Sequence, residues 1–254
     1  MSGAFVSASK QYLIADRGPV SLAPFTMACW AKPTFAGNGG GNQCAMTLSN
    51  VAGNDSNWSL GVDGTPEWWF RCANTNSSQA DELDISAGVV ANTWQFAMAR
   101  CTTNTNRSLH ILNANGTIQN GNTTVSVAPT TITNMAIGNS VINAEINTSP
   151  FDGLIGEAWV ANIDVWPDGG VIDPVFFRYL AWNGPWAVPR IAAAIQVYKP
   201  LRQTLGTGTD VPDENFTIGI PPVWTNTNGV TLAPNPQLQA VYPRPSDTRR
   251  YGVI

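Results

Sequence analysis

Charged side chains are scarce in this sequence, and their scarcity excludes some classes of protein. Only 12% of the 254 residues are Asp, Glu, Lys or Arg, which is about half the usual share. The formal net charge is −4. A general nucleic-acid binder carries a basic face, so no nucleic-acid partner is expected.

Long apolar runs and a leader pattern are also missing. No run approaches the roughly 18–20 apolar residues that a membrane-spanning helix needs. The first residues, MSGAFVSASKQY, lack the basic and then apolar pattern of a signal peptide. We therefore expect no membrane partner, and a chain that is made and folded in the cytoplasm.

Histidine and cysteine are too few, or too widely spaced, for the usual metal centres. His110 is the single histidine, so a zinc site is not expected. The four cysteines show no C-x-x-C spacing, and most lie in strand-like runs where a buried thiol behaves as a small hydrophobe. We expect four reduced core cysteines: Cys29, Cys44, Cys72 and Cys101.

Short strands separated by polar turns fill residues 1–165. The alternation of FTMACWAK predicts a strand with one shared face, made of Phe25, Met27, Cys29 and Ala31. WQFAMARC repeats the pattern with Trp94, Phe96 and Met98. Turn signals recur about every 8–15 residues, which is typical of an all-β, two-sheet antiparallel sandwich.

The residue pattern and the composition of the chain change after Pro167. Asp173 is suited to cap a helix, Pro174 to begin it and Gly184 to end it. We expect this helix to cover one sheet edge. From Pro200 the chain is rich in Pro, Thr, Gly and Asn, which favours an extended arm over a second core. The sequence thus predicts a sandwich at 1–168, a helical connector packed on it at 169–190, and an extended C-terminal arm at 191–254.

Four motifs give the strand region a family resemblance. They are FTMACWAKP, then NTWQFAMARC with SLHILNANG, then MAIGN, and finally FDGLIGEAWVANIDV. In this order, over roughly residues 20–168, they resemble laminin-G-like domains of the concanavalin A-like jelly-roll class. The resemblance implies a jelly-roll sandwich; it does not fix a function, because one fold hosts many.

A looser resemblance lies further on. The segment GPWAVPRIAAAIQVYKPLRQTLG, followed by VYPRP, is similar to the tails of laminin-G-like proteins of phages and prophages. This resemblance implies a phage structural protein, and it agrees with the missing signal peptide because phage proteins assemble in the host cytoplasm.

Glu157 and Asp164 are the first pair to consider as catalytic carboxylates. If both lie on one strand, their spacing of seven places them on opposite faces, roughly 23 Å apart. A catalytic pair needs about 5–10 Å. We interpret them as structural residues, with Glu157 capping a neighbouring turn.

Glu82 and Asp84, in DELDIS, resemble the first two positions of the catalytic signature of family-16 glucanases. In that family a third carboxylate donates the proton. Ser86 and Ala87 stand where it should be, and its loss removes about 10²–10⁴ in rate. No enzymatic activity and no catalytic residue are expected.

Trp68 and Trp69 are adjacent, so on a strand they face opposite sides. We expect one in the core and the other exposed, where it could stack on a sugar ring or on a protein partner. The resemblance allows calcium at a sheet rim, but no Asp-rich loop with ligand spacing stands out. No cofactor or metal is expected, and calcium stays an open alternative.

The end of the chain is basic and aromatic, although the protein is acidic overall. Arginine and tyrosine are enriched at protein interfaces. We therefore interpret the end as a partner-docking arm, carried by Tyr242, Arg244, Arg249, Arg250 and Tyr251.

Together these observations predict a non-enzymatic phage virion structural protein on the virion surface. The leading hypothesis is a capsid decoration (cement) protein whose arm docks on the shell, with the major capsid protein, other virion proteins or neighbouring copies as partners. The alternative is a lectin-like module on a tail or fibre that binds cell-surface glycan.

Overall fold

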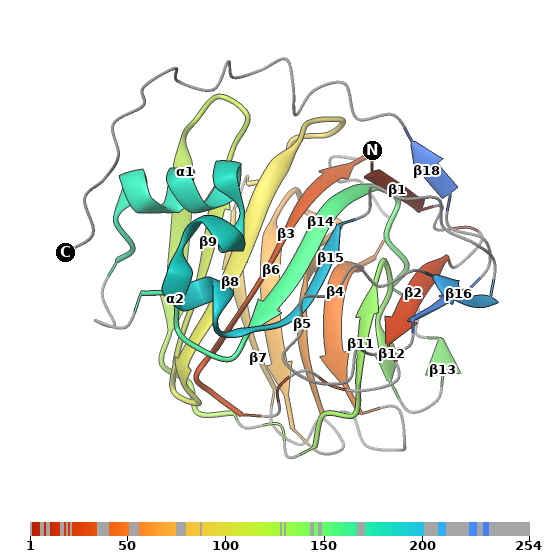
Figure 1. Cartoon of the computed structure of the whole chain (residues 1–254), viewed down its shortest axis with the longest axis horizontal. Coiled ribbons are helices and arrows are strands. Elements are labelled where there is room, and N and C mark those ends of the chain that lie inside the picture. The colour runs from red at the N-terminus through yellow and green to blue at the C-terminus, as the bar shows by residue number, and fades with distance from the viewer. Residues whose placement is uncertain are drawn as a thin grey trace.

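The protein is described here from a computed structural model, shown in Figure 1. The described residues are 2–5, 8, 11–15, 18, 20, 22–34, 41–50, 56–74, 80–86, 88–127, 129, 131–142, 145–146, 149–166, 171–200, 208–211, 224–227 and 231–233.

Sheet A has eight antiparallel strands. Seven lie in the order β10-β9-β8-β3-β14-β1-β18, and β15 pairs with β14 beside β1. Their bounds are Ile118–Thr123 (β10), Asn106–Leu112 (β9), Gln95–Thr103 (β8), Phe25–Pro33 (β3), Gly153–Ala161 (β14), Ser2–Phe5 (β1), Thr231–Ala233 (β18) and Ile195–Pro200 (β15).

Sheet B also has eight antiparallel strands, in the order β16-β17-β2-β11-β4-β5-β6-β7. Their bounds are Gly208–Val211 (β16), Trp224–Thr227 (β17), Tyr12–Ala15 (β2), Asn134–Ile137 (β11), Gln43–Ser49 (β4), Asn57–Val62 (β5), Trp68–Ala73 (β6) and Ala80–Ile85 (β7). A small separate pair is formed by β12 (Val141–Ile142) and β13 (Glu145–Ile146).

The main core lies between the two sheets and follows from strand alternation. Phe25, Met27, Cys29 and Ala31 of β3 all point into it, as the sequence predicts. All four cysteines are free and buried, which confirms that prediction. The predicted two-sheet antiparallel sandwich is therefore confirmed.

A second core covers the outer face of sheet A, the face turned away from sheet B. Trp94, Phe96 and Met98 share this face, as predicted, and pack against three short helices. The helices are α1 (Pro174–Asn183), the 3-10 helix η3 (Pro185–Ala187) and α2 (Pro189–Ala192). Figure 1 shows α1 and α2 lying over this sheet.

Helix α1 has the predicted bounds and a different position. The Asp173 carboxylate accepts hydrogen bonds from the first-turn amides, Pro174 begins the helix, and Gly184 ends it with φ 75°, a conformation that favours glycine. We expected the helix to cover a sheet edge, and this was wrong. It covers the sheet face, because its Phe177 ring packs on Phe96 and His110.

The sandwich continues beyond the point where the sequence suggested that it ends. We expected the core strands to stop near Val165, but β15 pairs with the C-terminal half of β14 and buries Val197 in the main core. Strands β17 and β18 pair with β2 and β1. The domain division at residues 168 and 190 stays a prediction, while these pairings join parts of the segment after 191 to both sheets.

Candidate functional site

The outer face of sheet B carries a row of polar side chains across four strands. Thr47 of β4 lies opposite Ser59 of β5, Ser59 opposite Arg71 of β6, and Arg71 opposite Glu82 of β7. Because residues directly opposite in antiparallel strands share a face, the four side chains form one line. We call this line the polar row.

The end of the polar row on β4 and β5 is buried. Thr47 and Ser59 are inaccessible or nearly so, and the Thr47 hydroxyl donates to the Asn139 carbonyl at 3.3 Å. The neighbouring Ser49 hydroxyl donates to the Val141 carbonyl at 2.5 Å. The residues just before β12 and within it therefore cover this end of the face. The Thr47 and Ser49 hydroxyls have a structural role, because they bind the backbone of this covering segment.

Trp69 lies beside the polar row on the same face. A methyl group at Gly61 would meet its ring at 2.6 Å, so the ring lies directly on the backbone of β5, and only glycine leaves room for it. The ring is 3% exposed, and its Nε1–H has no hydrogen-bond partner. A buried donor without a partner costs about 1–3 kcal/mol.

The other end of the polar row is open and acidic. Glu82 and Asp84 are exposed, and Arg71 is half-buried between their strand and β5. Partial burial and the Asp84 carboxylate raise the pKa of Glu82; partial burial, with Glu67 and Asp63, raises the pKa of Asp84. Negative charge thus exceeds positive charge here.

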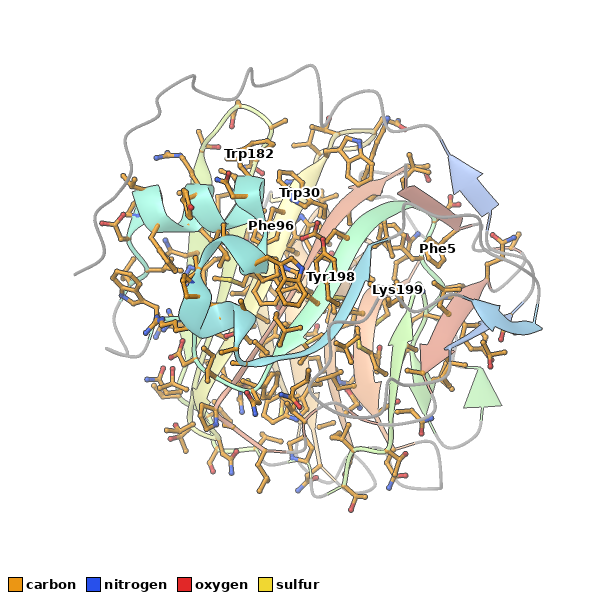
Figure 2. All side chains as sticks on the ribbon, viewed as in Figure 1. Phe5, Trp30, Phe96, Trp182, Tyr198 and Lys199 are labelled. Carbon is orange, nitrogen blue, oxygen red and sulfur yellow. The ribbon has the colours of Figure 1, made fainter. Side chains whose placement is uncertain are left out.

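A second accessible surface lies on α1. Four apolar residues with spacings of four, four and three point outward from the helix and the turn before it. Their exposed fractions are 72% for Val171, 63% for Val175, 41% for Tyr179 and 36% for Trp182. We call them the α1 stripe. Figure 2 shows Trp182 above Trp30, whose ring centroid lies 4.9 Å from its own.

The structure corrects the expectation for the two adjacent tryptophans. Trp68 points into the main core, where its Nε1 donates to Gln95 at 3.2 Å, and Trp69 faces the other way. The opposite directions were predicted. The exposure of one ring was wrong, because both are buried. Neither ring offers a free face for stacking on a sugar or a partner.

The five residues of the predicted docking arm lie outside the described residues. They are Tyr242, Arg244, Arg249, Arg250 and Tyr251. Their role stays a prediction.

Glu157 and Asp164 occupy different positions from those expected. Strand β14 ends at Ala161, so Asp164 lies in the following turn and not on the strand. Glu157 accepts a hydrogen bond from the Tyr198 hydroxyl at 3.0 Å, and Asp164 binds Arg100 of β8. Both carboxylates contact residues on the outer side of sheet A, so the prediction of opposite faces was wrong. They bind different partners, which agrees with structural roles.

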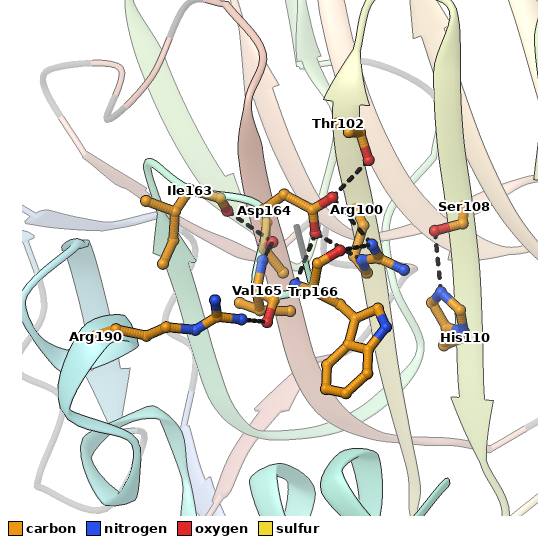
Figure 3. A network of polar contacts seen from close by, with 10 residues as sticks. Arg100, Thr102, Ser108, His110, Ile163, Asp164, Val165, Trp166 and Arg190 are labelled. Atoms are coloured by element: carbon orange, nitrogen blue, oxygen red, sulfur yellow. Dashed lines mark hydrogen bonds and ion pairs between the residues drawn. The ribbon is translucent and has the colours of Figure 1, made fainter. Parts of the chain in front are cut away.

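Asp164 is the centre of the network in Figure 3. Its carboxylate accepts from Arg100 Nε at 2.7 Å, from the Thr102 hydroxyl at 2.5 Å and from the Trp166 amide at 2.9 Å. Burial alone would raise the pKa of Asp164, but these hydrogen bonds and the Arg100 charge lower it. The network fastens the turn after β14 to β8.

His110 lies near this network on β9. It bonds Ser108 at 3.0 Å through Nε2, and Nδ1 has no partner. Burial, with the Arg100 charge, lowers the pKa of His110 from 6.5 to about 3. The imidazole is therefore neutral at pH 7, and its contact with Phe177 gives it a packing role.

Metal ligands are not grouped in the part of the chain that the structure describes. Within it, no three His, Cys, Asp or Glu residues are arranged to hold a metal ion. The absence of a cofactor, with calcium as the alternative, stays a prediction. Among the same residues, no helix is both long and apolar enough to cross a bilayer.

Comparison with known proteins agrees with the sandwich fold. The sequence profile described as the concanavalin A-like lectin/glucanases superfamily, of laminin-G type, matches residues 7–165. The chain belongs to this superfamily. No curated protein matches the sequence.

Several solved structures are similar to this chain at low sequence identity. Tailspike protein 2 of bacteriophage CBA120 is 12% identical with a TM-score of 0.51, and the match covers 79% of this chain and 31% of the tailspike domain chain. The CBM40 of a Ruminococcus gnavus IT-sialidase is 15% identical with a TM-score of 0.48, covering 70% and 91%. Mouse laminin alpha1 domains LG4-5 are 12% identical with a TM-score of 0.46, covering 63% and 40%.

Proposed function

We propose that this protein is a non-enzymatic structural protein of the phage virion. Specifically, it is a capsid decoration (cement) protein on the virion surface, bound to the major capsid protein. The α1 stripe is the observation that carries the proposal. The tail-like segment that begins at Gly184, directly after α1, supports the phage assignment.

The α1 stripe is difficult to explain in an isolated molecule. Phe177, Leu180 and Ala181 lie on the other side of α1 and are buried in the second core, so the helix presents apolar residues on two opposite sides. Contiguous exposed apolar residues mark interaction sites. An apolar surface of the shell protein would cover the stripe and complete the burial of the helix.

A non-enzymatic role also agrees with the carboxylates of the glucanase-like motif. Glu82 and Asp84 share the outer face of sheet B, since they are two apart on β7. Residue 86 is a serine, so the proton donor of the motif is missing there. Glu157 and Asp164 bind Tyr198 and Arg100 instead of facing a common substrate position.

Particle composition tests the proposal. Purified virions should contain many copies of the wild-type protein by mass spectrometry. Val175→Asp with Tyr179→Asp should reduce that copy number at least tenfold, because the charges would be buried against the shell. Val125→Asp is the matched control, since Val125 is 50% exposed and lies far along the chain from α1. Absence of the wild-type protein from virions, or normal incorporation of the double variant, would overturn the proposal.

Glycan binding on a tail or fibre is the second candidate, and the open end of the polar row, with half-buried Arg71 and exposed Glu82, favours it. The open end of the polar row offers a guanidinium and two carboxylates, which are groups that form hydrogen bonds with sugar hydroxyls. The surplus negative charge favours neutral glycans over acidic ones. The superfamily includes lectins, but the argument rests on this chain's own residues.

A glycan array tests this candidate directly. Arg71→Ala should abolish binding, whereas Arg178→Ala should leave it unchanged, because Arg178 lies on α1 and bonds the Gly116 carbonyl. No binding by the wild-type protein at millimolar glycan would exclude the candidate.

A further inference from the structure

Strand β10 is the end strand of sheet A beside β9, and one of its edges is unpaired. All six of its residues pair with β9, without a register shift. Among the described residues, no backbone hydrogen bond leaves its other edge. The N–H and C=O groups along such an edge can pair with another chain.

The alternation of hydrogen bonds shows which groups point toward this free edge. The Asn113 amide donates to the Thr117 carbonyl at 2.9 Å, in the register that joins β9 to β10. Because hydrogen-bonded pairs alternate along antiparallel strands, every second residue after Thr117 bonds to β9. Ile118, Asn120 and Asn122 therefore direct their N–H and C=O groups toward the free edge.

The two end strands on this side of the sandwich differ in charge. Strand β7 of sheet B lies beneath β10, since a methyl group at Gly121 would lie 3.2 Å from Leu83. Strand β7 reads ADELDI, with three carboxylates, whereas β10 reads IQNGNT, and no Asp, Glu, Lys or Arg occurs from Ser108 to Ala144. Charge, proline and bulges protect an edge against pairing. Strand β7 has charge for this protection, and β10 has none of the three.

A second copy of this chain fits the β10 edge. In an antiparallel pair, a two-fold axis through the middle of β10 would place Asn120 opposite Asn120 of the second copy, and Ile118 opposite Asn122. Each outward N–H then meets an outward C=O, because both copies have the same alternation. No charged residues oppose each other, whereas two β7 strands paired in this way would bring carboxylates together, which is destabilising. An interface of this symmetry closes as a dimer.

The side chains at the centre of β10 are suited to this contact. Asn120 and Asn122 are exposed, and Asn120 lies on the outer face of sheet A with its cross-strand neighbour His110. An amide side chain both donates and accepts hydrogen bonds. The Asn120 side chains of the two copies can therefore bond to each other.

The carboxylates of β7 predict how salt affects the contact. Glu82 and Asp84 lie on the outer face of sheet B, so they point away from β10, and Asp81 binds Arg107. Paired β10 strands would bring the two β7 strands of the dimer close to each other, with their repulsion acting through solvent. Salt screens such repulsion over about 8–10 Å, so added salt should strengthen the association.

We propose that two copies of this chain associate by antiparallel pairing of their β10 edges, centred on Asn120. The two-fold axis is perpendicular to the joined sheet, so both α1 stripes lie on the same side of it. Six residues from each copy bury less than the roughly 1,200 Å² of a stable interface, so the dimer is weak. The inference goes beyond the proposed function and does not depend on it, because it requires no particle.

Sedimentation of the pure full-length protein at micromolar to millimolar concentration tests the pairing. The wild type should form dimers as its concentration rises. Asn120→Lys and Asn120→Glu should each weaken dimerisation at least about fivefold, because like charges then meet at the axis. An equimolar mixture of the two variants should regain dimers. Thr131→Lys is the matched control, because Thr131 is exposed and precedes β11, which lies four strands from β7 in sheet B.

Sedimentation decides the inference without any particle. Dimers that return in the mixture support it. A wild type that stays monomeric at all concentrations, or dimers that persist unchanged in either Asn120 variant, would overturn it. A mixture that stays monomeric would overturn the pairing of Asn120 with itself.

Hydrogen exchange gives a second readout. The amides of Asn120 and Asn122 should become protected as the dimer forms. Unchanged exchange at these amides, or a dimer that added salt weakens, would overturn the β10 contact. Absence of the protein from virions would instead count against the proposed function alone.

Discussion

The outer faces of the two sheets differ in what covers them. The outer face of sheet A is apolar and carries Trp30, Phe96 and Trp159, and the chain adds α1, η3 and α2 to bury it. The outer face of sheet B carries hydroxyls, Arg71 and carboxylates, and it stays open at β7. Strand alternation produces both faces, so the choice of outward residues decides which face requires a cover.

The two outer faces therefore have different roles: the outer face of sheet A contributes to stability, and the outer face of sheet B is available for interaction. The cover of sheet A acts as a second core, and its loss should cost as much as a change in the main core. The open end of sheet B contributes little packing, and its residues are available for partners. The four predictions below test this division, beginning with the largest expected effect.

Phe177→Ala should lower the free energy of unfolding by about 3–5 kcal/mol, the range for a buried phenylalanine. The ring is fully buried and packs on Phe96 and His110. Tyr179→Ala, on the outward side of the same helix, should cost less than about 1 kcal/mol. Urea unfolding measures both. Equal effects would show that α1 does not act as a core element.

Asp164→Asn should cost about 3 kcal/mol, because it leaves the Arg100 charge buried without its partner. The amide oxygen can still accept from Thr102 or the Trp166 amide, so the loss should lie at the lower end of the range for broken buried pairs. Denaturant unfolding at pH 7 measures it. A decrease in the free energy of unfolding below 1 kcal/mol would show that the network in Figure 3 does not hold the turn after β14 against β8.

Stability should fall between pH 7 and pH 5 because of His110. Its pKa falls from 6.5 to about 3 on folding, so in this window the unfolded chain binds the proton and the folded chain does not. The expected loss is about 2 kcal/mol. Raised pKa values at Glu82 and Asp84 act in the opposite direction. His110→Phe should remove the loss in thermal melts at the two pH values; an unchanged loss would assign it to other groups.

Arg71→Ala should change stability by less than about 0.5 kcal/mol, as expected for a partly exposed residue that forms no ion pair with any other described residue. Thermal unfolding measures it. A large destabilisation would mean that the open end of sheet B is part of the packing, and the distinction between the two faces would fail.

The sequence predicted those features that local patterns encode. Alternation gave the faces of β3 and β8, and the Asp173, Pro174 and Gly184 signals gave α1. The pairing of β15 with β14 was not predictable from the pattern, since IQVYKP is short and follows a helix without a turn signal of its own. Asp164 was assigned to a strand because the apolar run continues past Ala161, although the chain turns there to reach Arg100.

The candidate site was less predictable than the fold. Glu82 and Asp84 were noticed through a catalytic motif, but their relation to Arg71 and Ser59 depends on cross-strand register, which no single segment contains. One of the two adjacent tryptophans was expected to be exposed, and the burial of Trp69 was missed because the sequence does not show that β5 presents Gly61 beneath its ring. One signal was available, since a glycine inside a strand often marks a close approach of another group.

The two halves of one edge of β14 are occupied by segments from opposite ends of the chain: residues 3–5 pair with one half and residues 195–200 with the other. This edge cannot be completed while the chain is being made until residue 200 has left the ribosome. Contacts between residues so distant in sequence slow folding. A nascent chain that ends at residue 165 would carry the whole family-matched region and still leave half of one edge of β14 unpaired, so folding should finish only after synthesis has passed the helices.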